Sequence, residues 1–208
     1  MSEVETNTSA DNDTAAPRKR PKPGERRVQI LQTLASMLER PGAERVTTAA
    51  LAAKLDVSEA ALYRHFASKA QMFEGLIEFI ESSVLGLVNQ ITEREQNATV
   101  RLGKMMGMLL QFGEKNPGMC RVMTGDALVF ENERLQERMN QLFDKLESHF
   151  KQNLRDLVAG SATPTVEAQA QASVLTAFCM GRLQRYGRSN FKRMPTEHLD
   201  ASLARLLG

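Results

Sequence analysis

Residues 45–69, RVTTAALAAKLDVSEAALYRHFASK, predict two short helices joined by a tight turn. Thr47 or Thr48 can cap the first helix, because a hydroxyl there accepts a hydrogen bond from an otherwise unpaired backbone amide. Ser58 can cap the second helix in the same way, after a turn at Asp56. This order of elements is typical of a helix-turn-helix. An ordinary helical hairpin is the alternative that the spacing alone leaves open.

The second helix of this motif separates a buried face from an exposed one. Leu62 and Phe66, four positions apart, are expected to point to the core. If the helix enters the major groove of DNA, its first residues approach base edges and other polar residues meet phosphates. The residues expected at base edges or in the groove are Ser58, Glu59, Ala60, Tyr63 and Arg64. Those expected at phosphates are Thr47, Thr48, Tyr63, His65 and Lys69, with Arg45 at the entry to the motif.

Charge is distributed unevenly along the 208 residues, although the formal net charge is only +2. Residues 17–69 hold eleven Lys or Arg against five Asp or Glu, whereas residues 70–208 hold sixteen of each. Residues 1–16 hold four acidic residues and no Lys or Arg. The positive excess therefore coincides with the helix-turn-helix, where phosphate binding requires it. A solvated basic surface is the alternative interpretation.

Residues 1–23 are rich in small and polar residues and lack apolar periodicity, so we expect a disordered tail. The tail runs into the segment PRKRPKPGERR, residues 17–27, in which six basic residues stand among three prolines. Such a basic arm can follow a phosphate backbone or enter a minor groove. An ordinary soluble tail explains the same composition equally well.

Several function classes find no support in the sequence. No apolar run approaches the ~18 residues needed to span a bilayer, and no apolar signal region opens the chain, so we expect a cytoplasmic protein. Cys120 and Cys179 stand far apart without a metal-binding motif, which predicts two buried, reduced thiols. Nothing resembles a Gly-rich phosphate loop, a metal cluster or a nucleophile with its base. We therefore expect no enzyme activity, no catalytic residue, no cofactor and no metal.

The rest of the chain repeats apolar residues at three- and four-residue steps and shows no useful alternating pattern, which predicts an all-α fold. A helix at residues 25–40 would complete a three-helix DNA-binding domain over residues 24–69. Residues 70–208 would form a helical dimerisation and partner-binding domain. An Ala-rich helix in that domain suits a central position or a two-fold helical interface. The helices expected there cover residues 68–94, 97–115, 117–123, 127–158, 163–188 and 195–207.

Residues 47–77, which contain YRHF followed by SK and an aromatic residue, resemble the TetR family of helix-turn-helix regulators. The stretches VSEAALYRHFASKAQMFEGLIEFIE, NPGMCRVMTGDALVFENERLQERMNQLF and FCMGRLQRYGRSNFKRMPTEHLD are similar to the bacterial nucleoid occlusion factors within that family. One departure is Asp56, where the family commonly has glycine. Asp tolerates the left-handed backbone conformation better than most residues, so we expect the turn to form with a small loss of stability.

The resemblance implies a homodimer of all-helical subunits that binds palindromic sites in double-stranded chromosomal DNA and is located on the nucleoid. It also implies binding to the C-terminal tail of the tubulin-like division protein FtsZ, which antagonises the division ring. Assembly beyond a dimer on DNA is left open. The generic alternative within the family is a transcriptional repressor that responds to a small ligand.

The resemblance places the FtsZ tail between the helices at residues 68–94 and 97–115. The residues that match such a groove are Phe79, Met108, Lys115 and Asn116. An acidic, apolar peptide would suit a Phe wall with a Lys at the rim. Burial in the core is the alternative for Phe79 and Met108.

Overall fold

The computed structural model describes residues 24–40, 45–160 and 162–208, and every regular element within these ranges is helical. The expected all-α fold is therefore confirmed. The expected tail at residues 1–23 lies outside the described residues. No helix in the described ranges is long and apolar enough to cross a membrane. The elements are α1 (Glu25–Leu38), α2 (Thr48–Leu55), α3 (Glu59–Tyr63), α4 (Lys69–Arg94), α5 (Ala98–Lys115), α6 (Pro117–Met123), the 3-10 turn η1 (Asp126–Leu128), α7 (Glu133–Leu157), α8 (Pro164–Arg188) and α9 (Leu199–Leu207).

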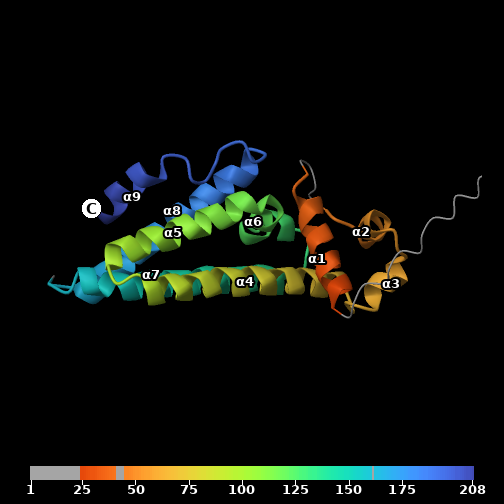
Figure 1. The fold of residues 1–208 in the computed structure, drawn as a ribbon, viewed down its shortest axis with the longest axis horizontal. Helices are drawn as coiled ribbons and strands as arrows, with labels where there is room; N and C mark the ends of the chain where they lie inside the picture. Colours follow the sequence, from red (N-terminus) through yellow and green to blue (C-terminus); the bar gives the residue numbers. More distant parts are fainter. Residues whose placement is uncertain (1–23, 41–44, 161) are drawn as a thin grey trace, which may run out of the picture.

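The molecule is elongated, with a small head at one end and a longer helical body (Figure 1). We call α1 to α3 the head and α4 to α9 the body. The long helix α4 starts beside the head and runs the length of the body, with α7 alongside it. Helix α5 returns above α4 toward the head, α8 packs on α7, and α9 lies at the far end against α5. Helix α3 is thus placed at one extremity of the molecule.

Capping residues set the starts of the head helices where the sequence predicts them. The hydroxyl of Thr47 accepts a hydrogen bond from the amide of Ala50 at 3.2 Å, and that of Ser58 accepts from Ala61 at 3.2 Å. Asp56 ends α2 in the left-handed conformation, with φ 55° and ψ 50°. The expected turn is therefore confirmed at a non-glycine residue, whose short polar side chain tolerates this region.

The helix that follows the head also begins at its expected cap. The hydroxyl of Ser68 accepts from the amide of Gln71 at 3.2 Å, and the Gln71 side chain accepts from the amide of Ala67 at 2.8 Å. In a standard capping box the return bond goes to the cap residue itself, so here it is shifted by one position. The shift still satisfies an amide at the start of α4.

Helices α1 and α6 make a second contact between head and body, besides that made by α4. The sequence does not predict this contact. Gly118 on α6 lies against the backbone of Ala35, so close that a Cβ at Gly118 would stand 2.0 Å from the Ala35 carbonyl oxygen. Arg121, one turn later, donates to the carbonyls of Leu38 and Arg40, both at 3.4 Å. These contacts hold the end of α1 on the body.

Three expected helix boundaries are wrong. Helix α1 ends at Leu38 rather than at residue 40. Helix α7 begins at Glu133 rather than at residue 127, because a 3-10 turn precedes it and the Asn132 side chain caps it by accepting from the amide of Arg134 at 3.1 Å. The last helix begins at Leu199 rather than at residue 195.

We predict that Gly118→Ala lowers the free energy of unfolding by about 1–3 kcal/mol, because the new methyl group would clash with the α1 backbone. Urea unfolding followed by circular dichroism measures the change. Gly86→Ala is the matched control, since nothing lies within 4 Å of a Cβ at that position in α4. The control should be neutral or gain up to about 1 kcal/mol from helix propensity. Equal effects of the two substitutions would contradict the close approach.

Candidate nucleic-acid interface

Helix α3 exposes the residues that the sequence assigns to DNA base edges. Glu59 and Ala60 follow the cap Ser58, and all three are exposed. The Tyr63 side chain is 44% exposed, whereas Leu62 is 1% exposed and anchors the helix in the core. The expected division of α3 into an inner and an outer face is therefore confirmed. The outer face can approach a groove without rearrangement of the helix.

A hydrogen bond across the turn ties the two motif helices together. The hydroxyl of Thr48 on α2 donates to a carboxylate oxygen of Glu59 on α3 at 2.5 Å. The single proton of the Thr48 hydroxyl is therefore used within the protein. This contact fixes Glu59 at the start of α3, where the helix dipole favours a negative charge. Glu59 keeps its exposed place at the start of α3, whereas Thr48 can donate to a phosphate only when this bond breaks.

Arg27 positions the end of α3 from α1. Its guanidinium donates to the carbonyl of His65 at 2.8 Å and stands 4.0 Å from the centroid of the Phe66 ring. The sequence places Arg27 in a basic cluster suited to phosphate, but its contacts here are with the protein. The two partners are 38 residues apart, so no local pattern could have predicted this contact.

Lys69 is the residue of the predicted interface that makes an ion pair. Its ammonium bonds the carboxylate of Glu131, in the loop that precedes α7, and lies 5.6 Å from the Phe73 ring centroid. The two charged side chains are 24% and 9% exposed. Glu131 belongs to no predicted site, because 62 residues separate it from Lys69.

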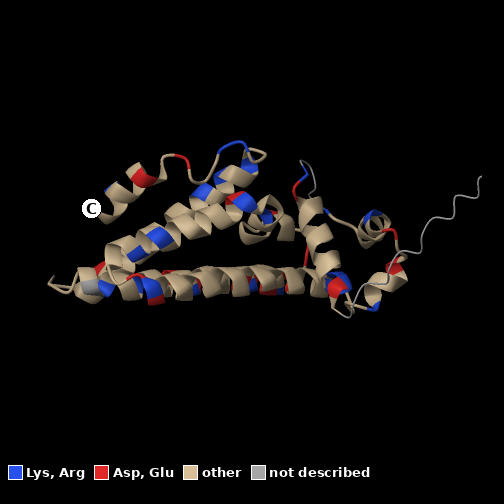
Figure 2. Cartoon of the chain, in the orientation of Figure 1, with Lys and Arg blue, Asp and Glu red and all other residues tan. Residues whose placement is uncertain are grey.

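The remaining residues of the predicted interface surround α2 and α3. Arg45, Thr47, Arg64 and His65 are all exposed. Arg64 forms the C-terminal boundary of α3, and Arg45 precedes the cap of α2. Figure 2 shows Lys and Arg on the head as well as on the upper body, and charges of both signs along the lower edge of the body. The structure thus brings the predicted DNA-contacting residues to one end of the molecule.

The four residues expected to bind the partner tail do not share one groove. Phe79 is 50% exposed on α4, so burial in the core is wrong for this residue. Lys115, which is exposed, and Asn116 lie together where α5 meets α6. Met108 is half-buried in a groove of about 520 Å³ between α5, α9 and the end of α4. The residues that line this groove are Ile91, Val100, Gly103, Lys104, Gly107, Met108, Gln111, Leu199, Asp200 and Leu203.

Both thiols are buried, as the sequence predicts. Burial raises the pKa of Cys120 to about 12, with a smaller contribution from the nearby Asp126, and burial alone raises the pKa of Cys179 to about 12. Both thiols are therefore protonated at neutral pH, which disfavours nucleophilic attack and metal binding. No group of three His, Cys, Asp or Glu in the described ranges is arranged to hold a metal ion.

Helix α8 exposes a stripe of small and apolar residues on the face opposite its buried residues. Val166 is 67% exposed, Val174 54% and Met180 42%. The stripe repeats at three-, four- and seven-residue intervals, as expected for one helix face. Its members are Val166, Ala170, Ser173, Val174, Ala177 and Met180.

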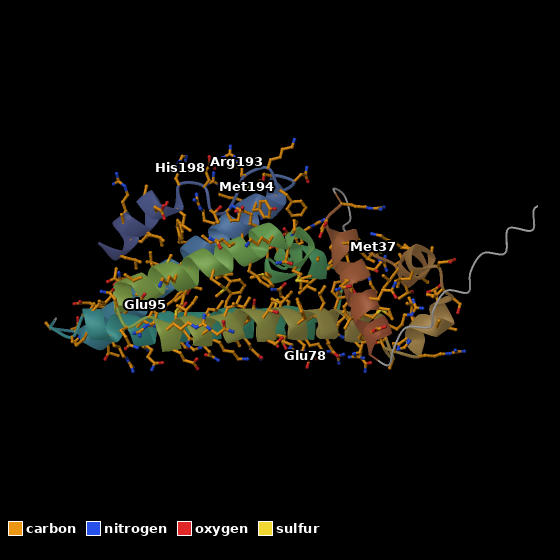
Figure 3. All side chains as sticks on the ribbon, viewed as in Figure 1. Met37, Glu78, Glu95, Arg193, Met194 and His198 are labelled. Atoms are coloured by element: carbon orange, nitrogen blue, oxygen red, sulfur yellow. The ribbon has the colours of Figure 1, made fainter. Side chains whose placement is uncertain are left out.

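Arg182, near the end of α8, is bonded within the protein, whereas Arg185 and Arg188 on the same helix are exposed. Arg182 donates to the carbonyl of Pro195 at 3.0 Å and to that of Glu197, which ties the loop before α9 to α8. Figure 3 shows Arg193, Met194 and His198 along the outer edge of that loop. Arg182 therefore stabilises the loop, and it is unavailable as a phosphate contact.

Comparison with known proteins gives consistent matches for head and body. Residues 30–76 match the family model described as bacterial regulatory proteins, tetR family, and residues 96–207 match the SlmA-like model described as tetracyclin repressor-like, C-terminal domain. The protein named nucleoid occlusion factor SlmA from Idiomarina loihiensis is 50% identical over 177 residues, covering 85% of this chain and 90% of the relative. That from Aliivibrio fischeri is 51% identical over 187 residues, covering 86% and 93%.

Solved structures show the same fold at much lower identity. The transcriptional regulator FadR from Bacillus subtilis, crystallised with stearoyl-CoA, superposes with a TM-score of 0.70 at 12% identity. The superposition covers 87% of this chain and 97% of the regulator. At this identity the likeness concerns the fold alone.

We predict that Arg27→Ala lowers the free energy of unfolding by about 1 kcal/mol, because it removes a charged hydrogen bond and a cation–π contact at a solvent-exposed site. Thermal unfolding of the two variants measures the effect. Arg26→Ala is the control, since the Arg26 guanidinium bonds the nearby Gln29 side chain on the same helix. The same loss in both variants would show that Arg27 does not position α3.

Proposed function

The chain belongs to the TetR family of bacterial regulatory proteins, and from this premise we propose that it is a DNA-binding nucleoid occlusion factor. In this proposal a homodimer binds palindromic sites on the chromosome. The bound dimer then binds FtsZ and antagonises assembly of the division ring over the nucleoid. The observation that carries the proposal is a sequence identity of 50–51% to proteins of that name, over 85–86% of this chain.

The DNA-binding part of the proposal rests on the exposure of α3 at the end of the head. In a helix-turn-helix, the start of the second helix reaches base edges, and residues around it contact phosphates. Ser58, Glu59 and Ala60 occupy the first of these positions here. Arg45, Thr47, Thr48, Tyr63, Arg64, His65 and Lys69 surround them. We propose residues 24–69 as the DNA-binding domain.

The dimerisation part of the proposal rests on the exposed stripe of α8. A monomer that exposes a repeated small and apolar stripe gains free energy by burying it, and a two-fold axis lets one stripe pack on its copy. Small residues allow two helices to approach closely. The two heads of such a dimer would meet half-sites about 34–36 Å apart along the duplex, which is one helical turn.

The FtsZ-binding part of the proposal rests on exposed groups of α4 and of the end of α5. Phe79 offers an exposed aromatic ring, and Lys115 offers a positive charge beside Asn116. An apolar peptide with acidic residues would match these groups. Met108 stands apart from them in the groove under α9, so we assign it less of the proposed contact. Residues 70–208 are proposed as the dimerisation and partner-binding domain.

The groove between α5, α9 and the end of α4 supports a second candidate function. Its mixture of apolar residues with Lys104 and Asp200 would suit a small amphipathic ligand. A repressor of this kind would be released from DNA when the ligand binds. Release by a small molecule without any effect of the protein on FtsZ would favour this alternative.

We predict that Tyr63→Ala weakens binding to a palindromic duplex about tenfold. Binding to unrelated duplexes should weaken by a similar factor, because the lost contact is to the sugar-phosphate backbone of the DNA. Fluorescence anisotropy over a salt series measures both affinities. Met194→Ala is the control, since Met194 is 47% exposed, close to the 44% of Tyr63, but lies in the body. An unchanged affinity for Tyr63→Ala would remove this residue from the interface.

We predict that Lys115→Glu abolishes the DNA-enhanced effect on FtsZ while DNA affinity stays within about twofold, because the reversed charge repels an acidic tail. Co-sedimentation of FtsZ polymers, with and without a palindromic duplex, measures the effect. Arg94→Glu, an exposed charge reversal at the far end of α4, is the control. If the wild-type protein shows no DNA-enhanced effect, the proposed function is wrong. If the wild-type protein shows the effect and Lys115→Glu retains it, the proposed FtsZ site is wrong.

A further inference from the structure

The ion pair between Lys69 and Glu131 joins the DNA-binding end of the chain to the body. Lys69 is the first residue of α4, directly after the cap Ser68. Glu131 lies in the loop between η1 and α7, where its amide donates to the carbonyl of Leu128 at 2.9 Å. The pair therefore connects the head-to-body helix with the loop that leads into α7.

The environment of this pair favours its persistence in the free protein. The Glu131 side chain is only 9% exposed, and that of Lys69 is 24% exposed. Ion pairs that are partly removed from water are screened less than surface pairs. A nearly buried carboxylate without its cation is costly, because it has lost its hydration. The ion pair between Glu131 and Lys69 is therefore energetically favoured in the free protein.

Two neighbouring ion pairs hold α4 to α7 independently of this contact. Arg134 bonds Glu74 at 2.5 Å, and Arg138 bonds Glu81 at 2.6 Å, with a second bond at 3.1 Å. Both lie further along the two helices, on the same seam. Release of Lys69 would thus leave the packing of α4 against α7 in place and would free only the loop.

The proposed function gives the Lys69 ammonium a second acceptor, since a phosphate of bound DNA would be an anion at the same end of the molecule. A lysine ammonium is a compact charge on a flexible stem, so it can exchange one anion for another by rotation of its side chain. We propose that Glu131 is an affinity-setting residue of the DNA interface, whose carboxylate competes with DNA phosphate for Lys69. This inference rests on the proposed DNA binding.

The proposed competition predicts that the Glu131 carboxylate lowers the affinity of the protein for DNA. While Glu131 is present, DNA gains the Lys69 contact only by displacing a carboxylate, so the net gain is small. Without that carboxylate, Lys69 is free to neutralise a phosphate and to release its counterion. Each phosphate neutralised steepens the dependence of log binding constant on log salt by about 0.9.

The test compares Glu131→Gln with the wild-type protein by anisotropy on a palindromic duplex over a salt series. Glutamine keeps the shape of the side chain and an acceptor for Lys69, while it removes the charge. The expected result is a slope steeper by about one per subunit and tighter binding at low salt by about tenfold. Glu131→Ala, run in parallel, should change both quantities in the same direction.

Glu133→Gln is the matched control, because it removes one exposed negative charge two residues away. It should change the slope and the affinity much less than Glu131→Gln. The Lys69→Ala and Glu131→Gln double variant tests the identity of the cation, because the gain has to disappear when Lys69 is absent. A gain that survives in the double variant would overturn the inference.

The salt series distinguishes failure of the role of Glu131 from failure of the proposed DNA binding. Salt-dependent binding by the wild-type protein, with Glu131→Gln indistinguishable from Glu133→Gln, would overturn the role of Glu131 and leave the proposed function intact. Absence of salt-dependent binding to palindromic DNA by the wild-type protein would overturn the proposed function itself, and the inference with it.

Discussion

One face of α4 stays buried from Met72 to Val88, and both head and body depend on that continuous burial. Its first turns pack under the head, where a Cβ at Gly75 would meet the Phe66 ring at 3.2 Å and Leu31 at 3.3 Å. The rest of the helix lies in the body, packed against α5 and α7. Because one rigid helix packs in both the head and the body, within one continuous core, a displacement of the head has to be accommodated by the body.

The exposed end of the head is organised by contacts that use polar groups of the protein itself. Thr48 is bonded to Glu59, Arg27 to the His65 carbonyl, and Lys69 to Glu131. The first two fix the orientation of α3 before any ligand arrives, which reduces the ordering required on binding. The third holds a cation that a phosphate would otherwise attract. Orientation and restraint of the proposed DNA interface therefore come from the same small set of bonds.

The body differs from the head in how its outer elements are held. Helix α9 has no fully buried residue, and its Leu199 and Leu203 rest on Gly107 and Gly103 of α5, where a Cβ would meet each leucine at 3.6 Å. Such a helix is retained by a modest apolar contact, and a groove remains beside it. The exposed stripe of α8 and the exposed Phe79 leave further apolar surface for partners. These features suit the proposed role of the body in dimerisation and partner binding.

The sequence by itself determined the helix-turn-helix, because caps, a turn and an apolar period act within a few residues. Thr47, Ser58, Asp56 and Ser68 all occupy the predicted positions. Tertiary structure alone decided the partners of Arg27 and Lys69, since those lie 38 and 62 residues away. It also decided that α7 begins at Glu133, where local periodicity predicted a start at residue 127, and that Phe79 faces solvent, a choice that the sequence left open. Periodicity identifies a helix, but long-range packing chooses which side faces the core and which charges meet.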